Sequence, residues 1–375
     1  MSKIIESISW PLILPILIFI ISNPKELVDG RTISNVVNQA IIRTIKVGKD
    51  ETIHCYDIYK QPSLNHPSLR NHTLQLWPST YPKNIKSNNL GTLRLTQGWH
   101  NYGTCPQGTI PIRSDMGKNY HSIRSHKHHH LKYARNNTLH PNVNTDGHEY
   151  AVIRVRGSFL GAQAKINLWN PVVETRYEMS ISQIWVIAGE NDDLNSIEAG
   201  WETDDYKNGC TNLECPGFVH TSSDISLGCH FTEMSTFNGD QKDATFGVHK
   251  DQNSGNWWIS VQGIPVGYYP SSLFSQLSKK AVRIEFGGEI YGERSKGRHT
   301  STQMGSGHFP SEGRFGISSF FNHVQIINEN NEANDPENVD IYVSDPSCYD
   351  LKIDNKYTSG YGFYYGGPGY NNNCQ

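Results

Sequence analysis

Short stretches in which apolar and polar residues alternate fill the second part of the chain, from His148 onward. Examples are YAVIRVRGSF, AKINLWNP, YEMSISQIWVI, NWWISVQ, GYYPSSLF and AVRIEFGGEIYG, and clusters of Gly, Asn, Asp and Pro separate them. Alternation with a period of two is typical of a strand that is buried on one face. Many short strands of this kind predict an all-β domain, most simply an antiparallel β-sandwich of two packed sheets, with a closed barrel as the alternative.

The first part of the chain has a different pattern. Residues Ile33 to Val47 alternate at roughly helical spacing, and the strand-like stretch ETIHCYDIY follows, so we expect a small mixed or β unit here. Residues 62–86 are rich in Pro, Asn, His and Ser without a sustained period, which predicts an extended loop. Residues 121–146 are basic, rich in His and almost without apolar pattern, as expected for a linker between two domains.

The N-terminus has the pattern of an export signal. Lys3 lies in a short polar head, and an apolar run from Trp10 to Ile21 follows it. This run is shorter than the ~20 apolar residues that cross a bilayer comfortably, so residues 1–22 are interpreted as a signal peptide, with an uncleaved anchor as the alternative. We therefore expect a secreted protein, extracellular or vacuolar, without a membrane segment after signal removal. The triplets at Asn71 and Asn136 are predicted glycosylation sites.

Composition supports this picture and excludes several functions. The chain has 375 residues, 33 Gly, 18 Pro and 19 Tyr, and only 18% of its residues are charged. Such a mixture favours strands and turns, and the length allows more than one domain. The net charge is −3 without a long block of Lys and Arg, so no nucleic-acid partner is predicted. Peptides or sugars are the expected partners.

Seven cysteines in an exported chain predict disulfides with one thiol left over. Cys210 and Cys215 are close enough in sequence to form a small loop, and Cys348 with Cys374 would fix the C-terminal tail. Cys55 with Cys105 is the third predicted bridge. Cys229 is the unpaired residue on this assignment.

Common catalytic and cofactor motifs are absent from the sequence. No G-x-S-x-G, H-E-x-x-H or phosphate-binding glycine loop occurs. The histidines at 126 and 128–130 lie in the predicted linker, where a proton-sensitive hinge is a better interpretation than a metal site, and no metal or cofactor is predicted. Glu198 and Glu289 remain, each beside Gly and large apolar residues. Two partly buried carboxyls that share one proton provide one acid and one base.

Several phrases resemble the neprosin family of plant proteins, in the order that the family has them. In the N-terminal part these are IYKQP, HPSL and CPQGTIPIR, which resemble the activation domain of the family. In the C-terminal part they are IEAGWET, GCTNLECPGFV, NWWISV, GYYPSSLF, FGGEI and STQMGSGHFP. With the signal peptide at 1–22 and the His-rich linker at 126–146, the resemblance implies an activation (pro) domain at 23–125 and a catalytic β-sandwich at 147–375.

The same resemblance implies a glutamic peptidase that is made as a zymogen, matures at acidic pH and is inhibited by its own pro domain. The catalytic pair falls on Glu198 and Glu289, and proline-rich peptides cut after proline are the implied substrates. Four aromatic residues are candidates to line the substrate groove or to form core between the sheets: Trp257, Trp258, Tyr268 and Tyr269.

One segment departs from the family pattern. Only residues 202–208 stand where the family has an additional segment with an aromatic strand. Its loss directly after Glu198 would alter the cleft or open a sheet edge. The alternative function is therefore an inactive β-sandwich that binds peptide or cell-wall carbohydrate through its aromatic face.

Overall fold

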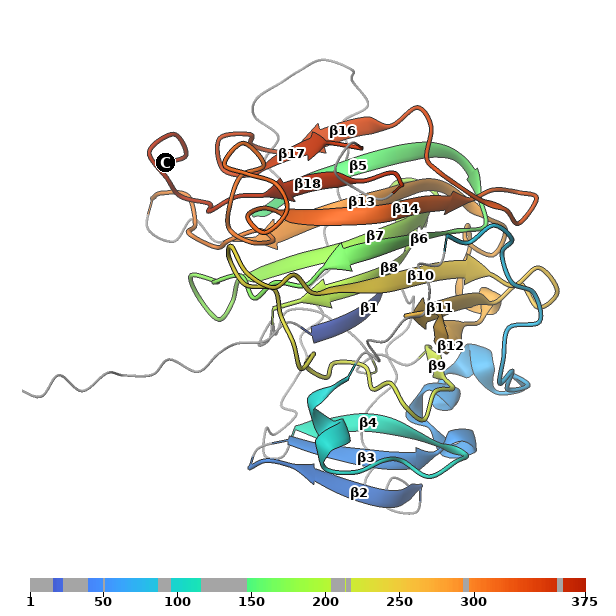
Figure 1. Ribbon diagram of the computed structural model, residues 1–375. Coiled ribbons are helices and arrows are strands. Elements are labelled where there is room, and N and C mark those ends of the chain that lie inside the picture. Colours follow the sequence, from blue (N-terminus) through green and yellow to red (C-terminus); the bar gives the residue numbers. More distant parts are fainter. Residues whose placement is uncertain are drawn as a thin grey trace, which may run out of the picture.

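The computed structural model describes residues 16–22, 40–49, 51–86, 96–115, 147–203, 213, 217–292, 297–355 and 360–375. Two large antiparallel sheets lie against each other, and a small three-stranded sheet lies beside them (Figure 1). The predicted all-β fold with a sandwich and a small β unit is confirmed. Within the described residues, no helix is long and apolar enough to cross a membrane.

The first sheet of the sandwich has six strands and carries both candidate glutamates. Its order is β1-β8-β7-β13-β5-β16. The strands are β1 (Ile16–Ser22), β8 (Asn195–Glu202), β7 (Met179–Ala188), β13 (Ala281–Tyr291), β5 (His148–Phe159) and β16 (Asp340–Val343). β7 is buried along its whole length, in agreement with its central position and its content of Ile, Val and Trp.

The second sheet has nine strands, with the order β17-β18-β14-β6-β10-β11-β12-β9 and β15 paired to β14. The strands are β17 (Asp350–Ile353), β18 (Phe363–Gly366), β14 (Ser319–Ile327), β6 (Gly161–Asn167), β10 (Asp243–Lys250), β11 (Trp257–Val261), β12 (Ile264–Tyr269), β9 (Val219–His220) and β15 (Ala333–Asn334). The main core lies between the two sheets. This core includes Ile184 and Val186 of β7 and Phe246 and Val248 of β10. The residues that alternate with them along each strand therefore point to the outer face of their sheet.

The small sheet consists of β2 (Ile41–Val47), β3 (Glu51–Asp57) and β4 (Thr109–Asp115), in that order. The predicted strand at ETIHCYDIY is confirmed by β3, but the helical interpretation of Ile33 to Val47 is wrong for residues 41–47. These residues are mainly β-branched Ile, Thr and Val, which favour strands, and their backbone pairs with β3 from Ile41 to Val47. Residues 23–39 and the predicted His-rich linker lie outside the described residues.

Residues 61–86 run from the small sheet over the outside of the nine-stranded sheet. Two short 3-10 turns interrupt the predicted extended loop, at Pro62–Asn65 and Pro67–Leu69. The Gln61 side chain donates to His220 O and accepts from His220 N, at 3.0 and 2.8 Å. Further along, Lys83 pairs with Glu332 in a parallel bridge. The N-terminal unit and the sandwich are therefore in direct contact through backbone and side chains.

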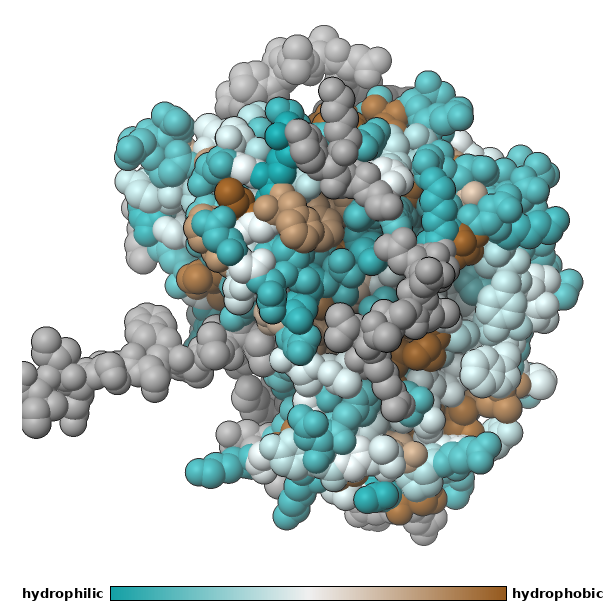
Figure 2. All heavy atoms as spheres, in the orientation of Figure 1, coloured by the Kyte–Doolittle hydropathy of each residue, from teal (hydrophilic) through white to brown (hydrophobic). Residues whose placement is uncertain are grey.

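Two of the three predicted disulfides are confirmed, Cys55–Cys105 in the small unit and Cys348–Cys374 at the C-terminus. Cys229 is a free, buried thiol as expected. Cys210 and Cys215 lie outside the described residues, and so does the predicted glycosylation site Asn136. Asn71 is exposed, and its glycosylation stays a prediction. The visible surface is mainly hydrophilic, with apolar residues in separate patches (Figure 2).

Candidate active site

Glu198 points to the outer face of the six-stranded sheet from the middle of β8. Its carboxylate accepts hydrogen bonds from Gln183 Nε2 at 2.8 Å and Ser196 Oγ at 2.9 Å. Burial is the largest cause that raises the pKa of Glu198 to about 8, and the negative charge of Glu289 adds to it. The two hydrogen bonds act in the opposite direction. Glu198 is consequently protonated at neutral and acidic pH.

Glu289 lies near the end of β13 and is only 6% exposed. Its Oε1 lies 2.6 Å from His148 Nδ1 and accepts a hydrogen bond of 2.8 Å from the Tyr150 hydroxyl. Both partners come from β5, the neighbour of β13, in which Tyr150 stands opposite Glu289. Within the described residues, Oε2 of Glu289 has no hydrogen-bond partner. The environment of Glu289 therefore differs from that of Glu198, whose hydrogen-bond partners among the described residues are Gln183 and Ser196.

The register places both glutamates on the same face. Glu198 is opposite Trp185 of β7, and Trp185 is opposite Glu285 of β13, four residues before Glu289. Residues four apart in a strand point to the same side. With ~4.8 Å between strands and ~3.4 Å per residue, the two Cα atoms are roughly 10 Å apart across the sheet and ~14 Å apart along it.

This spacing differs from the expected pair that shares one proton. No hydrogen bond joins the carboxyl groups of Glu198 and Glu289 in the part of the chain that the structure describes. The separation across and along the sheet leaves room for a water molecule and a peptide group between the side chains, and the charge of Glu289 contributes to the raised pKa of Glu198. Gln183, on the strand between them, contacts Glu198.

Two glycines keep the backbone around Gln183 close-packed. A Cβ on Gly200 would lie 2.1 Å from Ser182 O, and a Cβ on Gly287, whose φ is +153°, would lie 2.2 Å from Ala151 O. Both glycines are opposite Gln183, in β8 and β13 respectively. Gly200, Gln183 and Gly287 form a cross-strand row that lies between the two glutamates. Because neither glycine carries a side chain, Gln183 supplies the side chain of this row. This accounts for the Gly residues beside both glutamates in the sequence.

Sequence reasoning missed the residues that contact the glutamates. Gln183 and Tyr150 lie in predicted strands, where the period-two pattern allows them to be assigned to the outer face. Ser196 lies in β8, which was not among the predicted strands, and His148 lies just before the first of them. The pairing of β5 with β13 and β7 with β8, which the pattern alone does not give, brings them to the carboxylates.

The structure separates the four predicted groove aromatics from the glutamates. Trp257 and Tyr269 lie in the main core, and the indole of Trp257 donates to Leu277 O at 2.8 Å. Trp258 and Tyr268 lie on the outer side of the nine-stranded sheet, in a cluster with Leu69 of the N-terminal segment. The outer face that carries the glutamates has its own aromatic cluster, with Tyr150, Trp185 and Tyr342.

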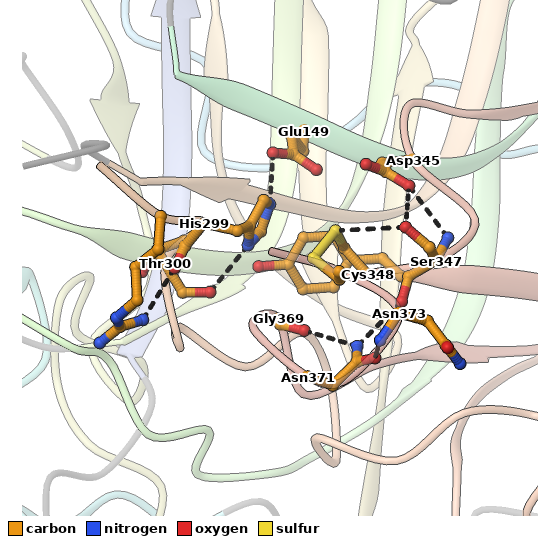
Figure 3. Close-up of a disulfide and its surroundings, with 12 residues drawn as sticks. Glu149, His299, Thr300, Asp345, Ser347, Cys348, Gly369, Asn371 and Asn373 are labelled. Atoms are coloured by element: carbon orange, nitrogen blue, oxygen red, sulfur yellow. Dashed lines mark hydrogen bonds and ion pairs between the residues drawn. A yellow bond between two sulfur atoms is a disulfide. The ribbon is translucent and has the colours of Figure 1, made fainter. Parts of the chain in front are cut away.

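A buried ion pair supports the strand that carries His148 and Tyr150. His299 Nε2 lies 2.6 Å from Glu149 Oε1, and His299 Nδ1 lies 2.8 Å from Thr300 O (Figure 3). Both ring nitrogens of His299 thus lie within hydrogen-bond distance of an oxygen acceptor. His299 also lies with Cys348 and Cys374 in a group of potential metal ligands, but these two cysteines form a disulfide and offer no thiolate.

Comparison with known protein families gives two matches. The family model described as Neprosin matches residues 201–368, which include Glu289 and begin three residues after Glu198. The model described as Neprosin activation peptide matches residues 44–154, which include the small sheet, the segment over the nine-stranded sheet and the start of β5. The two matches follow one another along the chain in the order that the sequence phrases predicted. The chain therefore belongs to the neprosin family, with an activation-peptide region followed by a neprosin domain.

Proposed function

We propose that this chain is the zymogen of a glutamic peptidase in which Glu198 and Glu289 together activate water for hydrolysis of a peptide bond at acidic pH. The observation that carries the proposal is the position of the two carboxyls on one outer face of one sheet, with electrostatic interaction and different partners. The match to the neprosin family supports a peptidase with an activation peptide.

Glu198 has the properties of the general acid. Its raised pKa of about 8 keeps it protonated throughout the acidic range. A protonated carboxyl donates to the oxyanion that develops when water attacks the scissile carbonyl, or to the leaving amine. Gln183 and Ser196 hold the Glu198 carboxyl through both of its oxygens and so fix its orientation toward the row between the glutamates.

Glu289 is assigned the role of general base. Its Oε1 is held by His148 and Tyr150, which leaves Oε2 to accept the proton of an attacking water. In this scheme a water molecule lies beside Glu289, the carbonyl lies between the two side chains, and Glu198 is on the far side. The distance between the strands that carry the two residues is compatible with this order of groups.

We propose that the enzyme is an endopeptidase that cuts proline-rich peptides after proline. The outer-face aromatics Tyr150, Trp185 and Tyr342 lie beside the proposed catalytic residues, and aromatic surfaces bind extended proline-rich peptides well. We assign the secretory pathway as the location, extracellular or vacuolar, in agreement with the two disulfides.

Latency is proposed to depend on the activation region in two ways. Residues 61–86 attach this region to the sandwich on the nine-stranded sheet. In addition, β5 begins at His148, directly after the predicted linker, and His148 contacts Glu289. A cut just before His148 would therefore act at the site itself. The shortened segment after Glu202 leaves β8 fully paired to β7 from Asn195 to Glu202, and this favours the enzyme over the inactive binder.

The test is cleavage of a proline-rich peptide by purified full-length protein at roughly pH 3 to 5, the range in which a carboxyl pair works. The parent is compared with Glu198→Gln, Glu289→Gln and, as a matched control, Glu337→Gln, an exposed glutamate. We expect each of the first two changes to lower kcat at least ~100-fold and the control to keep parental activity. Equal activity in all four proteins would reject the proposal.

A further inference from the structure

The nine-stranded sheet carries a second polar site, on the side of the sandwich opposite to the glutamates. Asp251, directly after β10, is completely buried. Its Oδ2 accepts from Ser79 N at 2.6 Å and from Gln75 Nε2 at 2.7 Å, and its Oδ1 accepts from Ser79 Oγ at 2.7 Å and Thr80 Oγ1 at 3.1 Å. These four donors belong to the activation-peptide region, while Asp251 and a fifth donor, Asn253 N at 3.0 Å, belong to the neprosin domain.

The surroundings of Asp251 fit an extended segment. Pro78 is buried directly before Ser79, and Asn253 Nδ2 donates to Ser79 Oγ at 3.1 Å. Asn256 Nδ2 donates to Gln75 Oε1 at 2.9 Å. The same two segments are therefore joined by hydrogen bonds in both directions, which fixes the register of the bound segment and gives specificity.

An aromatic surface continues this site. The Tyr268 hydroxyl accepts from Gln75 N at 3.0 Å and lies 2.6 Å from His72 Nε2. Trp258 packs against Tyr268 with 4.7 Å between ring centroids, and Tyr81 stacks on His249. Trp258 is completely buried, yet its indole Nε1 has no hydrogen-bond partner among the residues described. An aromatic face beside a row of polar anchors is a typical binding surface for extended proline-containing peptides.

We propose that this surface, centred on Asp251, Tyr268 and Trp258, is a peptide-binding exosite for extended segments with the pattern proline followed by hydroxyl residues. Residues 72–83 of the activation region, which contain Pro78-Ser79-Thr80, occupy it in the intact chain. When that segment leaves, Asp251 keeps only the Asn253 N–H, at 3.0 Å, as a donor among the described residues. The positions that Gln75, Ser79 and Thr80 held on its carboxylate and beside Tyr268 become open to another donor segment. A second segment of the same chemistry then binds in its place. This inference does not depend on Glu198 and Glu289 being catalytic.

The experiment uses the full chain with a weakened internal occupant. The triple variant Gln75→Ala, Ser79→Ala, Thr80→Ala removes the side-chain donors to Asp251 and keeps Asp251 itself. A fluorescent synthetic peptide with the native sequence of residues 72–83 is added to the parent, to this variant and to the variant with the further change Asp251→Asn. The matched control is the same peptide with Ala in place of Ser79 and Thr80. It tests the hydroxyl contacts with Asp251 without any substitution in the nine-stranded sheet.

We expect the native peptide to bind the triple variant but not the parent, in which the site is occupied. Binding should be at least tenfold weaker in the variant with Asp251→Asn, and at least tenfold weaker for the peptide that lacks the two hydroxyls, because hydrogen bonds to a charged group are lost. Amide exchange of residues 72–83 is expected to be faster in the triple variant. Unchanged exchange, equal binding of the two peptides, or displacement of the native peptide by a neutral oligosaccharide would each overturn the proposal.

Discussion

His148 Nδ1 lies 2.6 Å from Oε1 of Glu289, so the first residue of β5 is in direct contact with the proposed general base. His148 also packs on Tyr291, at 4.9 Å between ring centroids. His148 is therefore both the first residue of β5 and a contact of Glu289. In the proposed zymogen, a cut in the predicted linker before His148 would act directly beside Glu289.

His148 is predicted to be a positioning residue. Replacement by Gln removes a charge-assisted hydrogen bond to Glu289, and we expect kcat to fall by about tenfold or more with little change in KM. The control is His308→Gln, which removes a histidine from an exposed pair with Glu312. Parental kcat in His148→Gln, or a change confined to KM, would argue against this role.

Glu198→Gln is predicted to alter stability in a pH-dependent way. The pKa of Glu198 is raised by burial to about 8 in the folded chain, whereas an unfolded glutamate titrates near 4.3. The stability that the protonated form provides is fully present below the unfolded value and is lost as pH rises toward 8. The variant should therefore unfold at a higher temperature than the parent at pH 8 and at nearly the same temperature at pH 4. Thermal melting at both pH values checks this, and an equal difference at both would contradict it.

The interface between the N-terminal segment and the nine-stranded sheet is predicted to weaken in acid. Burial lowers the pKa of His249 and of His220 to about 4, so both are neutral in the folded chain at pH 6. Because free histidine titrates near 6.5, the stability that depends on their neutral forms is present above pH 6.5 and is lost as pH falls toward 4.

Amide exchange of residues 72–86, corrected for the intrinsic rate at each pH, measures this loss. Exchange should accelerate between pH 6.5 and 4, and the variant His249→Phe, which keeps a ring against Tyr81, should show a smaller acceleration. Asp251, His72 and Tyr81 also line this interface. The pKa of Asp251 is held below its usual range by its hydrogen bonds, so Asp251 stays ionised over this interval. Equal acceleration in parent and variant would rule out His249 as a contributor.

The C-terminal disulfide is predicted to stabilise the sandwich. Cys348 and Cys374 are separated by 26 residues, and a loop of this size corresponds to about 3.5 kcal/mol in the chain-entropy model. Replacement of both by Ser should lower the free energy of unfolding by roughly 2–4 kcal/mol in denaturant titration. The control Cys229→Ser changes a thiol that is already unpaired. A loss in the control as large as in the double variant would contradict the assignment.

Much of the fold could be predicted because strand periodicity is a local property. The alternation in YEMSISQIWVI and AVRIEFGGEIYG correctly indicated β7 and β13. The error at residues 41–47 has a physical origin, since short apolar patterns fit both helix and strand and pairing with β3 decides between them.

The site could be predicted only in part. Glu198 and Glu289 were recognised by family resemblance, whereas their partners depend on which strands are neighbours. The same applies to Trp257 and Trp258, adjacent residues of β11 that point to opposite faces, one into the core and one under the activation region. A sequence pattern predicts that successive side chains of a strand alternate between two faces, but it does not predict which segment of the chain covers each face.

The most direct test of the central claim compares Glu198→Gln, Glu289→Gln and the double variant on one proline-rich peptide at acidic pH. If the two carboxyls act as one catalytic unit, the effects are not additive, and each single variant loses nearly as much activity as the double variant. That is the result the structure predicts. Effects that multiply, or a single variant that retains parental kcat, would contradict it.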